Sequence, residues 1–254
     1  MPAISPTYRN QFSDEESVRR YDADQYGSSS YSSLMWEFEK LQLDAVLRKM
    51  RSTHAEIDYL DFASGSGRII GYLEDKVDTA TGIEISQAMV DVAAARVTRA
   101  NFICGDITRD DEPVENTYDL ITAYRFMLNA EPDLRQQAIH ALARRLRDKD
   151  SVLVFNNHGN LPSHKLVLWP IHRAMAIGGG HRTSHNYMTN KQAERLASSA
   201  GLQIVETMGC GFIGRRLAGR LPAAGIGRLE GAAARSTLLQ PFCVNQTYIV
   251  KLRP

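Results

Sequence analysis

Cysteine is scarce in this sequence. Its 254 residues include three cysteines, Cys104, Cys210 and Cys243, which lie far apart and form no Cys-x-x-Cys pair. A disulfide framework or a structural zinc site needs paired or closely spaced cysteines, so the sequence argues against both. We expect the three thiols to be reduced and mostly buried.

Long apolar runs and an excess of one charge are also missing. No apolar run reaches the roughly 18 residues of a membrane-spanning helix, and "MPAISPTYRN" has no apolar core of a signal peptide. The 30 lysines and arginines balance 29 aspartates and glutamates, which removes any global attraction to nucleic acid or anionic membranes. We expect a soluble cytoplasmic protein, a monomer or homodimer, whose partner is a small molecule rather than nucleic acid or a membrane.

Strands and helices alternate regularly from Glu56 onward. Short apolar segments alternate with helical patterns, an order that is typical of a parallel sheet with right-handed crossovers. This pattern predicts an α/β fold with a doubly wound, Rossmann-like, seven-stranded and mostly parallel sheet. The expected strands cover residues 57–63, 79–86, 101–107, 118–124, 151–157, 202–209 and 245–252.

The first expected strand runs into a glycine-serine turn, "YLDFASGSGR" at residues 59–68. A nicotinamide-dinucleotide fingerprint needs Gly-x-Gly-x-x-Gly, but Ile70 stands where the third glycine belongs, after Gly65 and Gly67. A P-loop needs Gly-Lys-Ser/Thr, which is missing as well. The turn therefore fits neither phosphate-binding motif.

Acidic residues mark the carboxyl ends of the first three expected strands. Asp61 precedes the turn, and Glu84 ends the second strand, where its carboxylate can accept both hydroxyls of a ribose. Asp106 follows the third strand, within expected reach of an adenine amino group. Together these acids suit an adenosine ligand without a pyrophosphate, and a ligand with an ammonium group even better.

These features resemble the class I S-adenosylmethionine-dependent methyltransferases over residues 59–147. The family motif D/E-x-G-x-G-x-G corresponds to "DFASGSG" at residues 61–67, and "YDLITAYRFMLNA" resembles the fourth-strand motif, whose tail from Tyr124 to Asn129 lies beside the methionine and the substrate. The resemblance implies S-adenosylmethionine as cofactor, with its ammonium at Asp61, its ribose at Glu84 and its adenine at Asp106. The implied cofactor contacts in this region are Asp61, Ala63, Gly65, Gly67, Glu84, Ile85, Met89, Asp106 and Ile107.

Ala63 departs from the family motif, which has glycine at this position. Alanine is tolerated if φ is negative at this position, so we expect a modest adjustment of the turn rather than lost cofactor binding. A sharp gain in cofactor affinity on Ala63→Gly would contradict this interpretation.

Methyl transfer from a sulfonium is an in-line displacement that needs alignment, exclusion of water and often removal of a proton. The expected catalytic residues follow the fourth and fifth strands: Tyr124, Arg125 and above all His158, whose ordinary pKa of about 6.5 suits a general base. An equally open alternative is that His158 bonds loop backbone and only shapes the pocket. The substrate-binding candidates are Asn129, Asn157, His181 and His185.

No metal site is expected. His181 and His185 are four residues apart, but they follow three glycines in "GGGHRTSHNY", where no helix is expected, and no cysteine lies near them.

We expect one methyltransferase domain over residues 1–254. Its parts are a helical cap over 1–55, a cofactor-binding half over 56–157, and substrate-side insertions at 158–187 and 211–240. Tyr21 and Tyr26 in the cap are either a lid over the cofactor or surface-packing tyrosines.

The favoured acceptor is a small molecule methylated on oxygen, either a specialised metabolite or a sugar-bearing compound. No NPPY or DPPY follows the fourth strand, which argues against methylation of amino groups in DNA bases or glutamine. The alternatives are methylation of nitrogen or carbon, an RNA or protein acceptor, and a cofactor-binding protein without catalysis.

Overall fold

The computed structural model describes residues 30–109, 116–163, 166, 187–214 and 223–254. Its centre is a seven-stranded sheet of order β3-β2-β1-β4-β5-β7-β6. The strands are β1 (Asp58–Phe62), β2 (Thr79–Glu84), β3 (Asn101–Cys104), β4 (Leu120–Ala123), β5 (Val152–Asn157), β6 (Leu202–Cys210) and β7 (Asn245–Leu252). β7 runs antiparallel to both β5 and β6, and the other neighbouring pairs are parallel. The predicted doubly wound, mostly parallel sheet is confirmed.

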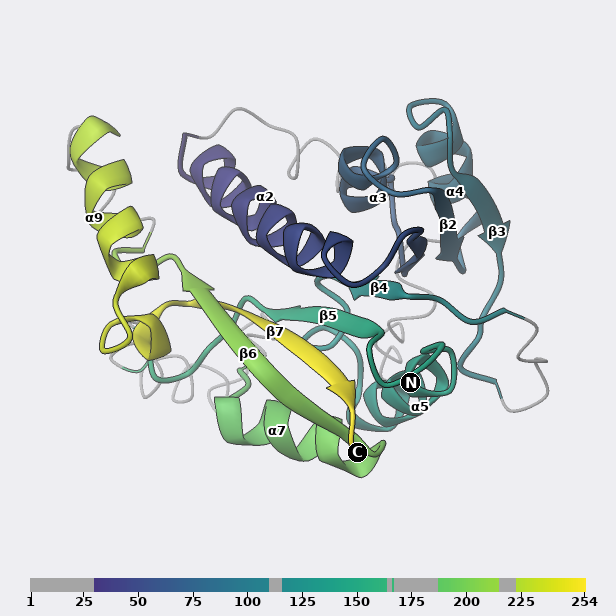
Figure 1. Cartoon of the computed structure of the whole chain (residues 1–254). Coiled ribbons are helices and arrows are strands. Elements are labelled where there is room, and N and C mark those ends of the chain that lie inside the picture. The colour runs from purple at the N-terminus through teal and green to yellow at the C-terminus, as the bar shows by residue number, and fades with distance from the viewer. Residues whose placement is uncertain (1–29, 110–115, 164–165, 167–186, 215–222) are drawn as a thin grey trace, which may run out of the picture.

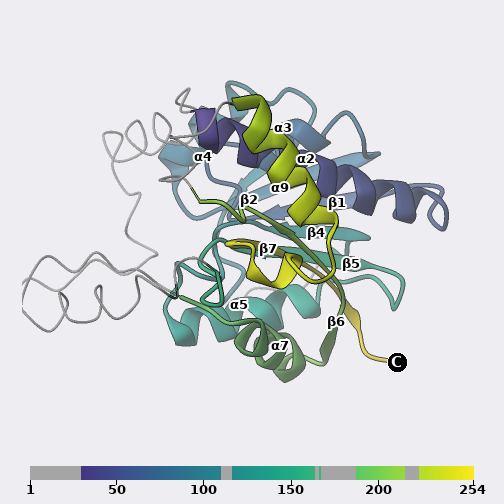
Figure 2. The ribbon, with the colours of Figure 1, turned by 90° about the vertical axis from the view of Figure 1, so that its left-hand side faces the viewer.

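Helices cover both faces of this sheet (Figures 1 and 2). They are α2 (Ser30–Arg51), α3 (Arg68–Leu73), α4 (Gln87–Ala94), α5 (Pro132–Ala143), α7 (Asn190–Ser199) and α9 (Ala223–Arg235), with a 3₁₀ turn at Gln240–Phe242. One hydrophobic cluster joins the sheet to α5 and α7, and a second joins its other face to α2 and α3. Among these described helices, none is long and apolar enough to cross a membrane.

The side chains of β1 show how the sequence divides between the two faces. Leu60 and Phe62 pack into the cluster with α5 and α7, whereas Tyr59 packs into the cluster with α2 and α3. Alternate strand residues point to opposite faces, so a strand with both faces covered reads as a continuous apolar run.

Local signals set the helix ends. Ser86 caps α4 by accepting the N–H of Met89, and Thr189 forms a capping box with Gln192 at the start of α7. Gly201 follows α7 at φ 72°, the left-handed conformation that is common just after a helix end.

The insertion after β6 contains a helix that the sequence did not predict. Glu230 on α9 is fully buried and accepts the backbone N–H groups of Gly211, Phe212 and Ile213 at 3.1, 2.7 and 2.9 Å. Three backbone donors satisfy this carboxylate, so α9 is fastened to the chain that leaves β6.

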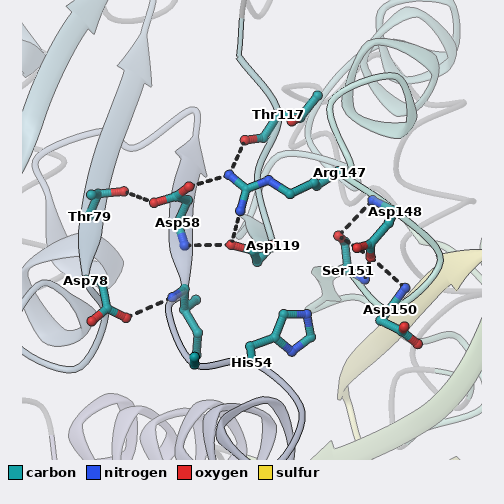
Figure 3. A network of polar contacts seen from close by, with 12 residues as sticks. His54, Asp58, Asp78, Thr79, Thr117, Asp119, Arg147, Asp148, Asp150 and Ser151 are labelled. Carbon is teal, nitrogen blue, oxygen red and sulfur yellow. Dashed lines mark hydrogen bonds and ion pairs between the residues drawn. The ribbon is translucent and has the colours of Figure 1, made fainter.

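The amino ends of β1 and β4 are joined by an ionic network (Figure 3). Arg147 donates to Asp119 at 2.6 Å and to Asp58, and it reaches the carbonyl of Thr117 at 3.1 Å. The hydroxyl of Thr79 donates to Asp58 at 2.7 Å. The hydrogen bonds from Thr79 and Arg147 lower the pKa of Asp58. These ion pairs and hydrogen bonds stabilise the amino ends of the central strands, opposite to their carboxyl ends.

The cysteines partly follow the expectation. All three are free thiols, and Cys210 and Cys243 are buried. Cys104 is exposed on the edge strand β3, so the thiols are mostly buried, as expected, with this one exception.

Candidate functional site

A pocket opens at the carboxyl ends of β1, β2 and β4. It encloses about 710 Å³ of space, open solvent included. Its lining residues are Phe62, Ala63, Gly65, Ile83, Glu84, Ile85, Met89, Gly105, Asp106, Thr108, Tyr124, Arg125, Phe126 and Leu134. Many of the residues selected from the sequence therefore meet in one place.

Glu84 joins the glycine turn to the tip of β2. Its Oε2 accepts the N–H of Gly65 at 3.0 Å, and its Oε1 accepts those of Ile85 and Ser86 at 2.8 and 3.0 Å. Burial raises the pKa of Glu84, and the three N–H donors oppose that rise. A carboxylate offers about four lone-pair positions, so capacity remains for a ligand hydroxyl. The remaining acceptor capacity of Glu84 and its position at the end of β2 fit a ribose hydroxyl.

Asp61 lies beneath the turn and does not line the pocket. It is 1% exposed, and its carboxylate accepts the hydroxyl of Thr122 at 2.6 Å and the N–H of Ile70 at 3.2 Å. Tyr59 and Thr122 are joined by a further 2.6 Å hydrogen bond. Burial raises the pKa of Asp61 to about 7. In this structure Asp61 braces α3 against β1 and β4, and its contact with the methionine ammonium stays a prediction.

Ala63 has φ 54°, so the condition of a negative φ is not met at this position. The chain must reverse direction between β1 and α3, and the backbone N–H of Ser64 donates to the carbonyl of Ile83 at 3.1 Å. Gly65 also has a left-handed φ of 55°. Ala63 therefore holds a conformation that favours glycine, with a strain of about 1–2 kcal/mol.

Gly67 precedes α3 at φ 86° and does not line the pocket. A Cβ at this position would lie 3.0 Å from Cγ2 of Val97 and 3.1 Å from Cβ of Ala93. This glycine allows α3 to approach the end of α4 closely, which is a packing role rather than a visible ligand contact.

The adenine-side candidates divide between pocket and core. Asp106 lines the pocket, and its Oδ1 accepts the N–H and the hydroxyl of Thr108 at 3.0 and 2.5 Å. Ile85 and Met89 also line it. Ile107 instead packs into the cluster with α5 and α7.

Two asparagines hold the backbone of Arg125. Its N–H donates to Oδ1 of Asn156 at 2.6 Å, and its carbonyl accepts from Nδ2 of Asn129 at 2.6 Å. Arg125 has φ 59°, so these two bonds hold a strained residue that lines the pocket beside Tyr124. Asn129, expected to contact substrate, acts here on the backbone.

The residues at the end of β5 bond to the backbone of neighbouring loops and do not line the described pocket. Asn157 is fully buried, donates to the carbonyl of Met188 at 2.8 Å and accepts the N–H of Gly159 at 3.0 Å. His158 is half-buried and is not among the described residues that line the pocket. Tyr21, Tyr26, His181 and His185 lie outside the described residues.

The sequence did not indicate several lining residues: Phe62, Ile83, Gly105, Thr108 and Leu134. Phe62 and Phe126 make an edge-to-face contact with centroids 4.8 Å apart. Most of these lining residues lie within or next to the motifs quoted above, and this closeness could have indicated them. Leu134 carries no such signal in the sequence, because only the packing of α5 brings it to the pocket.

Metal-binding residues do not gather in the part of the chain that the structure describes, where no group of three or more His, Cys, Asp or Glu could hold an ion.

Solved structures share this fold. Magnesium protoporphyrin IX methyltransferase from Synechocystis PCC 6803, with bound S-adenosylhomocysteine, aligns with a TM-score of 0.63 at 12% identity, over 96% of this chain and 98% of that one. An S-adenosylmethionine-dependent methyltransferase from Clostridium acetobutylicum ATCC 824 gives 0.56 at 14% identity, over 94% and 98%. A possible histamine N-methyltransferase from Thermotoga maritima gives 0.55 at 12% identity, over 94% and 97%. These similarities define the class I methyltransferase fold.

Residues 60–149 match the family model described as a methyltransferase domain. Over these residues the chain is a methyltransferase domain, and its fold is that of the class I S-adenosylmethionine-dependent methyltransferases, with S-adenosylmethionine as the cofactor that the motifs predicted. A search among curated proteins found no match.

Proposed function

We propose that this protein transfers the methyl group of S-adenosylmethionine to an oxygen atom of a small molecule. The observation that supports this most is the pocket itself, where Glu84 and Asp106 lie on one side and Tyr124, Arg125 and Phe126 on the other. The cofactor supplies an electrophilic methyl group. The protein's task is to hold and orient the two reactants and to exclude water.

Glu84, Gly65, Ile85, Met89 and Asp106 would hold the adenosine. Ala63 and the Gly67 turn would hold the methionine end together with Asp61, whose carboxylate lies directly below. Phe62, Phe126 and Leu134 line the same pocket and make its wall apolar. An apolar wall with a few polar groups is typical of a site for small organic molecules.

A small-molecule acceptor also agrees with two structural relatives, a magnesium protoporphyrin IX methyltransferase and a possible histamine N-methyltransferase. The catalytic candidates on the acceptor side are Tyr124 and Arg125, which line the pocket, and His158 after β5. The segments 158–187 and 211–240 would complete the acceptor side, and Tyr21 and Tyr26 would cover it, within a single domain.

Calorimetry with S-adenosylhomocysteine tests the cofactor assignment. Glu84→Ala should weaken binding at least tenfold, because the ribose would lose its carboxylate. Since Glu84 also fastens the turn, Glu84→Gln, which keeps the size and one acceptor oxygen, is the matched variant and should lose less. Unchanged affinity in both variants would contradict the ribose assignment.

Transfer of labelled methyl groups to alcohols, phenols, amines, RNA and protein tests the acceptor class. Label in neutral hydroxyl compounds is expected. Label only in RNA or protein, or no transfer by a protein that binds the cofactor, would contradict the proposed reaction.

A further inference from the structure

Glu39 on α2 is a buried carboxylate that the cofactor pocket does not explain. It is 2% exposed, and neither of its oxygens accepts a hydrogen bond from the residues that the structure describes. It forms an ion pair with Arg68, whose Nη2 lies 3.5 Å from Oε2. Burying a carboxylate without hydrogen bonds is costly, so an unsatisfied one calls for a functional explanation.

This carboxylate lies beside the pocket, behind Tyr124. Tyr124 follows β4, lines the pocket and packs into the hydrophobic cluster that joins the sheet to α2. Burial and, next, the charge of Glu39 raise the pKa of Tyr124. The same two causes raise the pKa of the Cys210 thiol at the end of β6. Glu39 therefore lies close to the carboxyl ends of β4 and β6, on the face that α2 covers.

Arg68 sets the charge of this region. It begins α3 directly after Gly67, is 14% exposed, and its guanidinium lies 4.8 Å from the ring centroid of Trp36. The positive charge of Arg68 balances that of Glu39, so an ammonium group entering here would face an existing cation. A neutral hydroxyl would meet no such repulsion and could donate to the open oxygens of Glu39.

We propose that Glu39 and Tyr124 form the acceptor subsite, that the acceptor is a neutral hydroxyl compound, and that Glu39 takes the hydroxyl proton. This inference rests on the proposed methyl transfer to oxygen. The acceptor oxygen bonds to the methyl carbon while the S–CH₃ bond breaks and leaves its electron pair on sulfur. The proton of the hydroxyl passes to Glu39, and Tyr124 donates a hydrogen bond to the acceptor.

This assignment differs from the sequence-based choice of His158 as the base. His158 is half-buried and does not contribute to the described pocket wall, whereas Glu39 is on α2, the helix that packs against the wall residue Tyr124. A carboxylate can act as a general base, and such catalysis contributes about 10²–10⁴-fold in rate.

The test compares Glu39→Gln with Glu37→Gln in the full-length protein. Glu37 lies on the same helix with its side chain 61% exposed, so it controls for loss of a charge from α2. Two quantities are measured: S-adenosylhomocysteine affinity by calorimetry, and transfer of labelled methyl groups to a panel of neutral phenols and alcohols and of primary amines. Glu39→Gln should lower kcat by about 100-fold or more and change cofactor affinity less than about twofold. Glu37→Gln should change neither.

Binding of catechol, as a neutral hydroxyl probe, to the S-adenosylhomocysteine complex gives a readout that does not need turnover. It should weaken in Glu39→Gln and recover partly in Glu39→Asp, while benzylamine should not compete. Wild-type rates in Glu39→Gln, or transfer only to amines, would overturn the assignment and leave methyl transfer intact. A wild-type protein that binds the cofactor and labels no acceptor would overturn the proposed function and this inference together.

Discussion

Gly67→Ala is the sharpest test of the turn geometry. The substitution places a methyl group at φ 86°, where it would lie 3.0 Å from Cγ2 of Val97 and 3.1 Å from Cβ of Ala93. Left-handed strain contributes about 1–2 kcal/mol, crowding about 1–3 kcal/mol, and the reduced entropy of the unfolded chain offsets about 0.5–1 kcal/mol. We expect the free energy of unfolding to fall by roughly 2–3 kcal/mol.

Gly65→Ala is the matched control. Gly65 has φ 55°, and a Cβ at this position would meet no atom within 4 Å. It should therefore show the strain without the crowding, a loss of about 0.5–1 kcal/mol. At about 2–4 °C per kcal/mol for a chain of this size, calorimetric Tm values should fall by roughly 4–12 °C for Gly67→Ala and by 1–4 °C for Gly65→Ala.

Val97→Ala completes a double-mutant cycle, because it removes the Cγ2 atom that the new methyl would strike. In the Gly67→Ala background it should cost at least about 1 kcal/mol less than in the wild type. Equal losses for the two glycine variants, or a coupling energy near zero, would refute the argument that Gly67 is required for close packing of α3.

Three further perturbations follow from the structure. Ala63→Gly should leave Tm unchanged or raise it slightly in a thermal scan, because relief of strain at φ 54° offsets the loss of a methyl group; a marked fall would contradict the strain. Asn156→Ala should lower Tm and weaken S-adenosylhomocysteine binding in calorimetry, since it leaves the N–H of Arg125 without its 2.6 Å partner; unchanged binding would detach Arg125 from the cofactor. Asp58 has a lowered folded pKa, so its stabilisation is present above about pH 4 and is lost as pH falls through the folded pKa. Asp58→Asn should therefore flatten the acid side of the Tm–pH curve, and an unchanged slope would contradict the linkage.

The cofactor half could be predicted because its signals are local. Each strand is an apolar run followed within a few residues by its functional group, such as Glu84 at the end of β2 or Asp106 after β3. Carboxyl ends of parallel strands meet at one edge of a sheet, so sequence order alone brings these groups together.

Predictions failed where conformation or packing decides. The left-handed φ of Ala63 could not be read from its identity, because alanine normally avoids that region and only the tight turn imposes it. The sequence also did not indicate that the amide of Asn129 donates to the carbonyl of Arg125, and the contact of Asn129 with the substrate stays a prediction. A hydrogen bond of this kind can be assigned only when the positions of both the side chain and the backbone group are known.

The acceptor side poses a different problem, since its residues come from distant parts of the chain. Glu39 on α2 reads in the sequence as one of several charged helix residues, beside the exposed Glu37. Only the packing of α2 on the sheet separates the two, because it buries Glu39 near Tyr124 and leaves Glu37 in water. The cofactor is recognised by a contiguous motif and the acceptor by this tertiary juxtaposition. For the same reason, Glu39→Gln and Glu84→Ala should separate the two halves of the reaction, the first lowering transfer and the second lowering cofactor affinity.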